Sequence, residues 1–190
     1  MKTIILASKS PRRLEILKNH GIEPLLMPTE TEEILPEIIT MEAAVEMLAE
    51  QKARACYDSI DPIEYPNSLI IGADTIVYKD EKMGKPVDTA DAFRMLDKIR
   101  NTFHYVVTGV CIIDTDTGQT EVLNDVTTVY CKDYTDEQIY EYIEQAQPFD
   151  KAGSYAIQGL FGKYIDHIDG DYENVVGLPF HRIEERIKNS

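Results

Sequence analysis

The chain has 190 residues, enough to bury a substantial hydrophobic core, and this length indicates a single domain, which can be built as two lobes. It carries 19 lysines and arginines against 34 aspartates and glutamates, and the resulting net charge of −15 excludes a protein that binds nucleic acid or an anionic membrane through its overall charge. An anionic ligand must therefore be small and held locally. Carboxylates that hold a metal ion would reconcile an acidic chain with a ligand that carries phosphate.

The cysteines and the apolar runs indicate the cellular compartment of the protein. Cys56, Cys111 and Cys131 lie far apart and form no Cys-x-x-Cys motif, so we expect buried thiols in a reducing compartment and no zinc site. The apolar runs are too short for a signal peptide or a membrane span. We therefore expect a cytoplasmic protein without a membrane or nucleic-acid partner.

Residues 4–13 predict a short buried strand, a turn with two serines and the start of a helix. Pro11 has the fixed φ that suits the first helical position, and Ser10 is expected to cap the helix. The first turn of a helix presents unpaired N–H groups and a positive dipole end, to which Arg12 and Arg13 add two charges. The segment is either a phosphate cradle or an ordinary capped helix with solvated arginines.

An acidic loop follows a second short strand, which is expected over residues 24–28. Glu33 in this loop is either a solvated surface residue or a metal ligand. Residues 41–57 predict a helix with an apolar face. Lys52 lies on this helix, where a lone lysine usually faces solvent.

A buried strand is predicted from residue 68 to 77, and Asp74 interrupts its apolar run. A carboxylate in such a strand is costly unless it is exposed at the strand end, paired or bound to a metal. Ligands of α/β proteins commonly bind at the ends of strands, so we interpret Asp74 as functional. After a polar turn at residues 79–82, Lys85 stands between a glycine and a proline that restrict the backbone.

The second half of the chain alternates helices with a long hairpin. Thr89 is expected to cap a helix that runs to about residue 100. Residues 104–114 and 119–130 predict an antiparallel hairpin, on which we interpret His104 as a strand-edge residue. Thr135 begins a capping box, which predicts a helix to about residue 145.

Residues 150–179 are dense in glycine and contain several polar side chains, among them Gln158. These glycines either let the backbone approach a ligand closely or form short turns between strands. The apolar spacing after Pro179 predicts a final helix.

Six motifs follow one another along nearly the full length of the chain. They are Leu6-Ala7-Ser8-Lys9-Ser10-Pro11-Arg12-Arg13, Ala73-Asp74-Thr75-Ile76-Val77, Gly84-Lys85-Pro86, Thr108-Gly109-Val110, Asp150-Lys151-Ala152-Gly153-Ser154-Tyr155-Ala156-Ile157-Gln158-Gly159 and Val175-Val176-Gly177-Leu178-Pro179. Together they resemble the Maf family of nucleoside triphosphate pyrophosphatases. The resemblance implies one domain over residues 1–190, of class α/β. A mixed central sheet would be flanked by helices, with two lobes around a deep cleft, as in inosine triphosphatases.

The resemblance also implies an activity and roles for individual residues. It implies a metal-dependent hydrolase that cleaves a nucleoside triphosphate between the α and β phosphates and releases the monophosphate and pyrophosphate. Asp74 matches the proposed proton acceptor, and Arg12, Thr75 and Gln158 match the positions that set substrate specificity. This trio looks like the branch that acts on dTTP and UTP. The branch that acts on 7-methyl-GTP is less similar, because it tends to carry an aromatic residue in place of Arg12 and a glutamate in place of Gln158.

Further matching positions contact phosphate or metal in the family. They are Ser8, Arg13, Lys52 and Lys85 for phosphate, and Glu33 with Asp74 for the metal. The resemblance further suggests a homodimer. Two places depart from the family pattern: Asn101-Thr102-Phe103-His104 replaces the usual Gly-Arg-Thr-His, and Glu30 and Glu32 stand where aspartates are common.

Phosphoryl transfer needs cations around the polyphosphate and carboxylates for a metal, and the sequence supplies both. A carboxylate is a weak base toward free water, but Mg²⁺ makes water more acidic, so Asp74 is a base, a metal ligand or both. Glu33 suits Mg²⁺ or Mn²⁺ as a hard oxygen ligand. The amide of Gln158 suits the imide edge of thymine or uracil.

Two other functions stay open at this stage. One is a regulator of cell division that binds nucleotide without catalysis. The other is a phosphatase that uses Asp74 as nucleophile, although no second aspartate stands beside it. Within the pyrophosphatase interpretation, the substrate is a normal or a modified pyrimidine nucleotide.

Overall fold

The structure is a computed structural model and describes residues 2–61 and 63–190. Its strands are β1 (Thr3–Leu6), β2 (Leu25–Leu26), β3 (Ser68–Tyr78), β4 (Lys82–Met83), β5 (Phe103–Asp114), β6 (Thr120–Cys131) and β7 (Ile165–Asp169). Its α-helices are α1 (Pro11–Asn19), α2 (Met41–Ser59), α3 (Thr89–Ile99), α4 (Asp136–Ala146), α5 (Tyr172–Val176) and α6 (Phe180–Lys188). Its short 3₁₀ helices are η1 (Pro148–Asp150), η2 (Ala152–Ser154) and η3 (Leu160–Tyr164).

The described strands form one mixed sheet in the order β2-β1-β3-β5-β6-β7, with β4 paired to β3. β1 runs parallel to both β2 and β3, whereas β4 pairs antiparallel with β3 and β7 antiparallel with β6. Parallel neighbours require crossover connections, and α1 and α2 supply them. The predicted α/β class with a mixed central sheet flanked by helices is confirmed.

The chain divides into two compact units, each with its own hydrophobic core. Unit one comprises Met1–Asp74, Thr108–Asp125 and Gly177–Ser190, and unit two comprises Thr75–Val107 and Val126–Val176. The core of unit one contains Cys56 and Cys111, and the larger, aromatic core of unit two contains Cys131. All three cysteines are buried and free, as predicted. The single domain and the deep cleft stay predictions.

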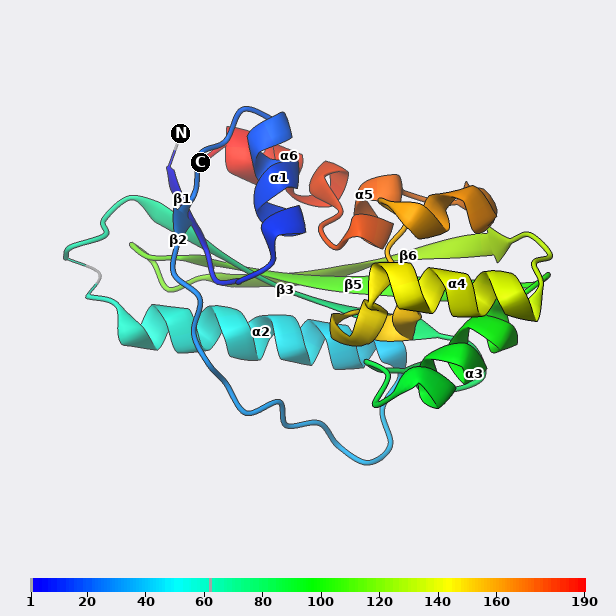
Figure 1. Cartoon of the computed structure of the whole chain (residues 1–190). Helices are drawn as coiled ribbons and strands as arrows, with labels where there is room; N and C mark the ends of the chain where they lie inside the picture. The colour runs from blue at the N-terminus through cyan, green and yellow to red at the C-terminus, as the bar shows by residue number, and fades with distance from the viewer. Residues whose placement is uncertain (1, 62) are drawn as a thin grey trace. The chain divides into compact units, whose positions relative to one another are not determined.

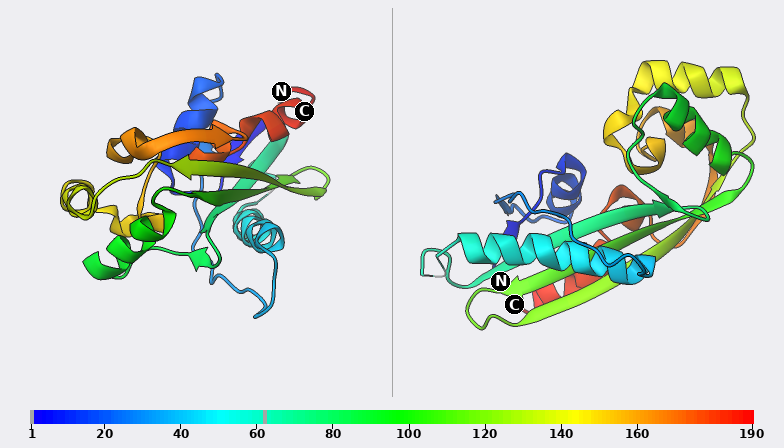
Figure 2. Two further views of the ribbon diagram at one scale, coloured as in Figure 1. Left: turned by 90° about the vertical axis from the view of Figure 1, so that its right-hand side faces the viewer. Right: turned by 90° about the horizontal axis from the view of Figure 1, so that it is seen from below.

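In unit one, helices lie on both faces of the strands. Figure 1 shows α2 along one face and α1 and α6 on the opposite face, and both views of Figure 2 agree. Glycines let α2 approach the sheet closely: a Cβ on Gly109 would lie 2.3 Å from the Val45 carbonyl oxygen, and one on Gly72 would lie 2.4 Å from that of Ala49. These distances are far below van der Waals contact, so only glycine fits at either position.

We expect Gly109→Ala to lower the free energy of unfolding by about 3 kcal/mol, because the added methyl group would push α2 away from β5. Chemical denaturation measures this loss. Gly84→Ala is the matched control, since a Cβ on Gly84 has no neighbour within 4 Å. Equal stability of the two variants would show that α2 does not pack on the strand as closely as described.

The predicted N-terminal caps of two helices are confirmed. Ser10 caps α1 with Pro11 in its first turn, and Thr135 forms the predicted capping box of α4. The predicted cap of α3 was wrong by one residue: the side chain of Asp88, not Thr89, accepts the hydrogen bond from the Asp91 N–H. Both are good capping residues, and the aspartate comes first in the chain. None of the described helices is long and apolar enough to cross a membrane.

Candidate active site

The turn between β1 and α1 holds two serines that organise the start of the helix. The Ser10 hydroxyl accepts a hydrogen bond from the Arg13 backbone N–H at 3.4 Å. The Ser8 hydroxyl accepts one from the Ser10 N–H at 3.1 Å and another from Nη1 of Arg13 at 3.2 Å. Ser8 therefore fixes both the turn and the guanidinium of Arg13.

The Arg13 side chain is held on two sides. Its Nε donates to the Gly177 carbonyl at 2.8 Å, which ties the start of α1 to the segment before α6. Burial lowers the pKa of Arg13, the charge of Asp74 opposes this effect, and Arg12 adds to it. An arginine stays protonated at neutral pH even so. Unit one thus holds a fixed positive charge at the N-terminus of α1, near the Asp74 carboxylate, and this arrangement suits an anionic ligand.

Lys52, Glu33 and Asp74 form a charged cluster in unit one. Lys52 Nζ lies 2.5 Å from Oδ1 of Asp74 and 3.1 Å from Oε1 of Glu33. The side chains of Lys52 and Asp74 are 21% and 14% exposed, whereas that of Glu33 is 52% exposed. The lysine on α2 therefore does not simply face solvent, and the acid on β3 is not isolated.

The donor atoms of the same cluster fit a divalent cation chemically. Both carboxylates converge on one ammonium group, so both already bind a positive charge, and carboxylate oxygens are what Mg²⁺ and Mn²⁺ prefer. The partial exposure of Glu33 leaves room for water and phosphate oxygens as further ligands. When bound, such a cation would supply positive charge to a polyphosphate and acidify water.

Unit two carries the remaining predicted site residues, two of which are exposed. Thr75 directly follows Asp74 on β3 and is half-buried, Lys85 is exposed between β4 and α3, and Gln158 is exposed between η2 and η3. The backbone N–H of Gly153 donates to the Gly84 carbonyl at 3.1 Å. This bond joins the segment that carries Gln158 to the loop that carries Lys85.

The structure thus sorts the predicted residues into two groups. Unit one holds Ser8, Arg12, Arg13, Glu33, Lys52 and Asp74, and unit two holds Thr75, Lys85 and Gln158. In unit one, a hydrogen bond connects Ser8 with Arg13, and ion pairs connect Lys52 with both carboxylates. Arg12 is half-buried on the first turn of α1 beside Arg13.

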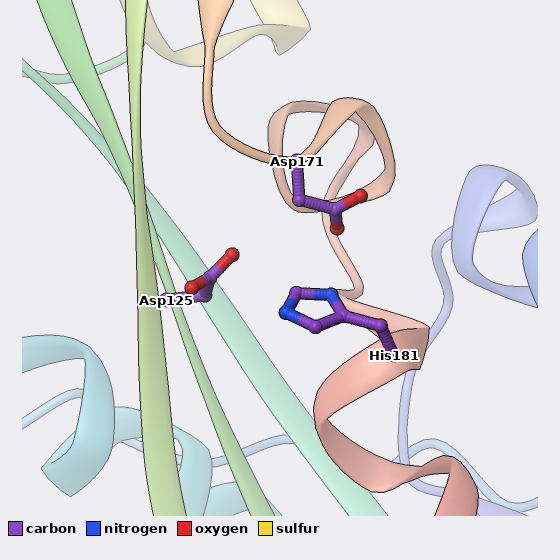
Figure 3. A group of neighbouring side chains, drawn as sticks. All are labelled: Asp125, Asp171 and His181. Atoms are coloured by element: carbon purple, nitrogen blue, oxygen red, sulfur yellow. The ribbon is translucent and has the colours of Figure 1, made fainter.

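Two further polar residues of unit one, Asp125 and His181, were not predicted as site residues from the sequence. Asp125 lies on β6 and His181 on α6, and their side chains point toward each other, with ligand atoms within 4.8 Å. Figure 3 also draws Asp171, which belongs to unit two and accepts a hydrogen bond from the Asn174 N–H at 2.8 Å. A strand residue and a helix residue 56 positions later share no sequence pattern, so no signal would have linked them. Two side chains are too few to define a metal site, and we assign no metal to them.

The family described as Maf-like protein matches residues 3–190 of this sequence. The chain belongs to the Maf family. A relative from Caldicellulosiruptor bescii is 43% identical over 184 residues, covering 96% of this chain and 92% of its own length. Relatives from Desulforamulus reducens and from Geobacillus sp. WCH70 are 43% and 40% identical over 189 residues, covering 99% of this chain and 96% and 98% of their own lengths. All three are named dTTP/UTP pyrophosphatase.

Two solved structures are similar to parts of this Maf chain. The dITP/XTP pyrophosphatase of Mycobacterium abscessus is 14% identical with a TM-score of 0.39, and the Ham1 protein of Staphylococcus aureus is 16% identical with a TM-score of 0.47. Each alignment covers 68% of this chain and 72% of the other. Both likenesses are too weak to carry an argument about this member of the Maf family.

Proposed function

We propose that this chain hydrolyses dTTP and UTP, and pyrimidine nucleotides with small modifications at C5, to the monophosphate and pyrophosphate. The names of its relatives support this activity, and relatives about 40% identical over nearly the full length are close enough to share a substrate class. The observation that carries the proposal is the cluster of Lys52, Glu33 and Asp74 in the unit that also presents Arg13 at a helix N-terminus.

In the proposed mechanism, the residues of unit one bind the polyphosphate and handle the proton. The N-terminus of α1 and the guanidinium of Arg13, which Ser8 orients, bind phosphate oxygens. Lys52 holds Asp74 in one orientation, so that the carboxylate accepts a proton from the attacking water. Glu33, together with Asp74, would hold the Mg²⁺ or Mn²⁺ cofactor. The water oxygen bonds to the α phosphorus, the bond from that phosphorus to the oxygen that bridges to the β phosphate breaks, and pyrophosphate leaves with the bridging oxygen.

Residues that select the base complete the proposal. Arg12, Thr75 and Gln158 set specificity, and Lys85 adds a phosphate contact. The Gln158 amide both donates and accepts, and it pairs with one side of the imide edge of thymine or uracil. Its exposure leaves the amide accessible to a ligand.

We expect Gln158→Glu to lower kcat/KM for dTTP and UTP by about 100-fold, because a carboxylate cannot donate to the base carbonyl and leaves it unpaired. Inhibition by inorganic tripolyphosphate, which has no base, should change by less than about threefold. Gln145→Glu adds the same charge to the exposed surface of α4 and is the control. An equal loss for every nucleotide tested would instead give Gln158 a structural role.

A product assay tests the proposed activity. With Mg²⁺ and dTTP, phosphorus NMR should show dTMP and pyrophosphate in equal amounts. Orthophosphate and dTDP would indicate a phosphatase, and binding without any product would indicate a nucleotide-binding regulator of cell division. A comparison of kcat/KM across a panel of nucleotides that includes 7-methyl-GTP and 5-methyl-dCTP then identifies the base that the enzyme prefers. Preference for 7-methyl-GTP would overturn the assignment to the pyrimidine branch.

The proposal also covers the cellular location and the oligomeric state of the enzyme. We place the enzyme in the cytoplasm, where its nucleotide substrates occur and where thiols such as the three buried cysteines stay reduced. The homodimer stays a prediction, which light scattering on the purified protein checks.

A further inference from the structure

His104 and Tyr155 form a hydrogen bond inside the core of unit two. His104 is 0% exposed and Tyr155 is 6% exposed, and Nε2 of the histidine lies 2.6 Å from the phenol oxygen. The two rings meet edge to face, with centroids 5.3 Å apart. Nδ1 of His104 lies 3.9 Å from Sγ of Cys131, so both ring nitrogens have partners in the core. This histidine is therefore not the strand-edge residue that the sequence indicated.

The electrostatics keep both partners uncharged. Burial lowers the pKa of His104 to about 3, and the charge of Lys79 acts in the same direction. Burial also raises the pKa of Tyr155 well above its ordinary value. At neutral pH a neutral imidazole therefore faces a neutral phenol, and the phenol O–H donates to Nε2. A buried pair of this kind is expensive to break, because the partner left behind loses its hydrogen bond.

Tyr155 is the anchor of the segment that carries Gln158. Ser154, directly before it, has a φ of +64°, a conformation that is strained for a residue other than glycine and must be held by its surroundings. The Ser154 hydroxyl contacts the sulfur of Met95 at 3.1 Å, and the Tyr155 ring packs on Phe161 at 4.8 Å. Three residues after Tyr155, Gln158 reaches the surface.

The same segment also holds the loop that carries Lys85. The Gly153 N–H donates to the Gly84 carbonyl at 3.1 Å, one residue before the lysine. A Cβ on Gly153 would lie 2.8 Å from Cγ1 of Val77, so the segment fits closely against β3. A shift of Tyr155 would therefore reach both exposed side chains.

We propose that His104 is a positioning residue for substrate binding: through its hydrogen bond to Tyr155 it fixes Gln158 and, through Gly153, Lys85. The inference rests on the proposed function, because it assigns these two side chains to the base and to a phosphate. The buried histidine would thus affect substrate binding although its own side chain is 0% exposed.

The test is a double-mutant cycle. His104→Leu and Tyr155→Phe should each raise KM for dTTP about tenfold while kcat falls less than about threefold, because misplaced binding groups weaken substrate binding. The double variant should be less impaired than the product of the two single effects, since both partners of the bond are then gone. His104→Gln, which keeps an acceptor for the phenol, should recover part of the loss.

Tyr134→Phe is the matched control. The Tyr134 hydroxyl donates to the Leu96 carbonyl at 2.7 Å in the same core, and its ring also packs on Phe161, but the residue lies outside the 151–159 segment. This variant should lose comparable thermal stability and keep KM for dTTP within about twofold, because only a structural hydrogen bond is removed.

Amide hydrogen exchange makes the outcome independent of the enzyme assay. The amides of Gly153 and Ser154 donate to the carbonyls of Gly84 and Lys151. Exchange at these two amides should accelerate at least about tenfold in Tyr155→Phe but not in Tyr134→Phe, because the anchor of the segment is lost only in the first. If wild type releases no pyrophosphate, the proposed function fails, and exchange still tests the anchor. If wild type is active but Tyr155→Phe and Tyr134→Phe behave alike in KM and exchange, the positioning role of His104 is overturned.

Discussion

Asp74→Asn should lower kcat for dTTP by about 1,000-fold, since asparagine keeps the size of the side chain but can neither accept the proton of water nor contribute a charge to a divalent cation. The side chain of Asp74 is only 14% exposed, and its Oδ1 lies 2.5 Å from Nζ of Lys52, so this ion pair fixes the orientation of the carboxylate. Steady-state kinetics with Mg²⁺ and a pyrophosphate-coupled assay measure the loss.

Two controls make the Asp74 result interpretable. Circular dichroism and thermal unfolding establish that the variant is folded. Glu30→Gln removes an exposed carboxylate that pairs with the exposed Lys9, and it should change kcat by less than about threefold, as expected for a surface ion pair. A folded Asp74→Asn protein with wild-type turnover would refute the catalytic role of Asp74.

Lys52→Met should lower kcat/KM for dTTP by about 100-fold, because it removes the cation that orients Asp74 and is assigned to a phosphate oxygen. Methionine retains the aliphatic part of the side chain, so packing along α2 is largely kept. The two carboxylates would then face each other without the ammonium that lies 2.5 and 3.1 Å from them. The measurement is the dependence of rate on dTTP concentration at saturating Mg²⁺.

The control for Lys52 is another lysine of unit one with an ion-pair partner. Lys9→Met removes the exposed partner of Glu30, and kcat/KM should stay within about threefold of wild type. Comparable losses in Lys9→Met and Lys52→Met would mean that the effect follows from net charge, not from the position of Lys52.

The structural features that sequence predicted best depend on neighbouring residues. The cap at Ser10, the proline in the first turn of α1 and the capping box at Thr135 each involve residues within a few positions of one another. The second strand was predicted over residues 24–28 but is only Leu25–Leu26. An edge strand extends only as far as its partner pairs with it, and β1 pairs with two of its residues.

The features that sequence missed join distant parts of the chain. Gly72 and Gly109 are needed because α2 approaches the sheet closely at both positions. A glycine in a strand does not by itself predict which helix packs against it. His104 and Tyr155 are 51 residues apart in the sequence. The alternation of apolar and polar residues along a strand shows only that one face of the strand is buried. The hydrogen bond that makes His104 a core residue therefore had no local signal.

The candidate site falls between these two cases. A helix start with two arginines and an acid in an apolar strand were visible as separate signals. The spacing of Glu33, Lys52 and Asp74 along the chain did not predict that they meet, and their common assignment came from the family resemblance. The contacts of Lys52 with both acids supply the physical connection within unit one.

The most direct test of the site is a crystal structure of the wild-type protein with Mg²⁺ and α,β-imido-dUTP, an analogue that resists cleavage. We expect the triphosphate at the N-terminus of α1 in contact with Arg13, and Mg²⁺ at about 2.1 Å from carboxylate oxygens of Glu33 and Asp74. A nucleotide bound elsewhere, or Arg12 and Asp74 opening onto separate surfaces, would contradict the assignment of these residues to one triphosphate.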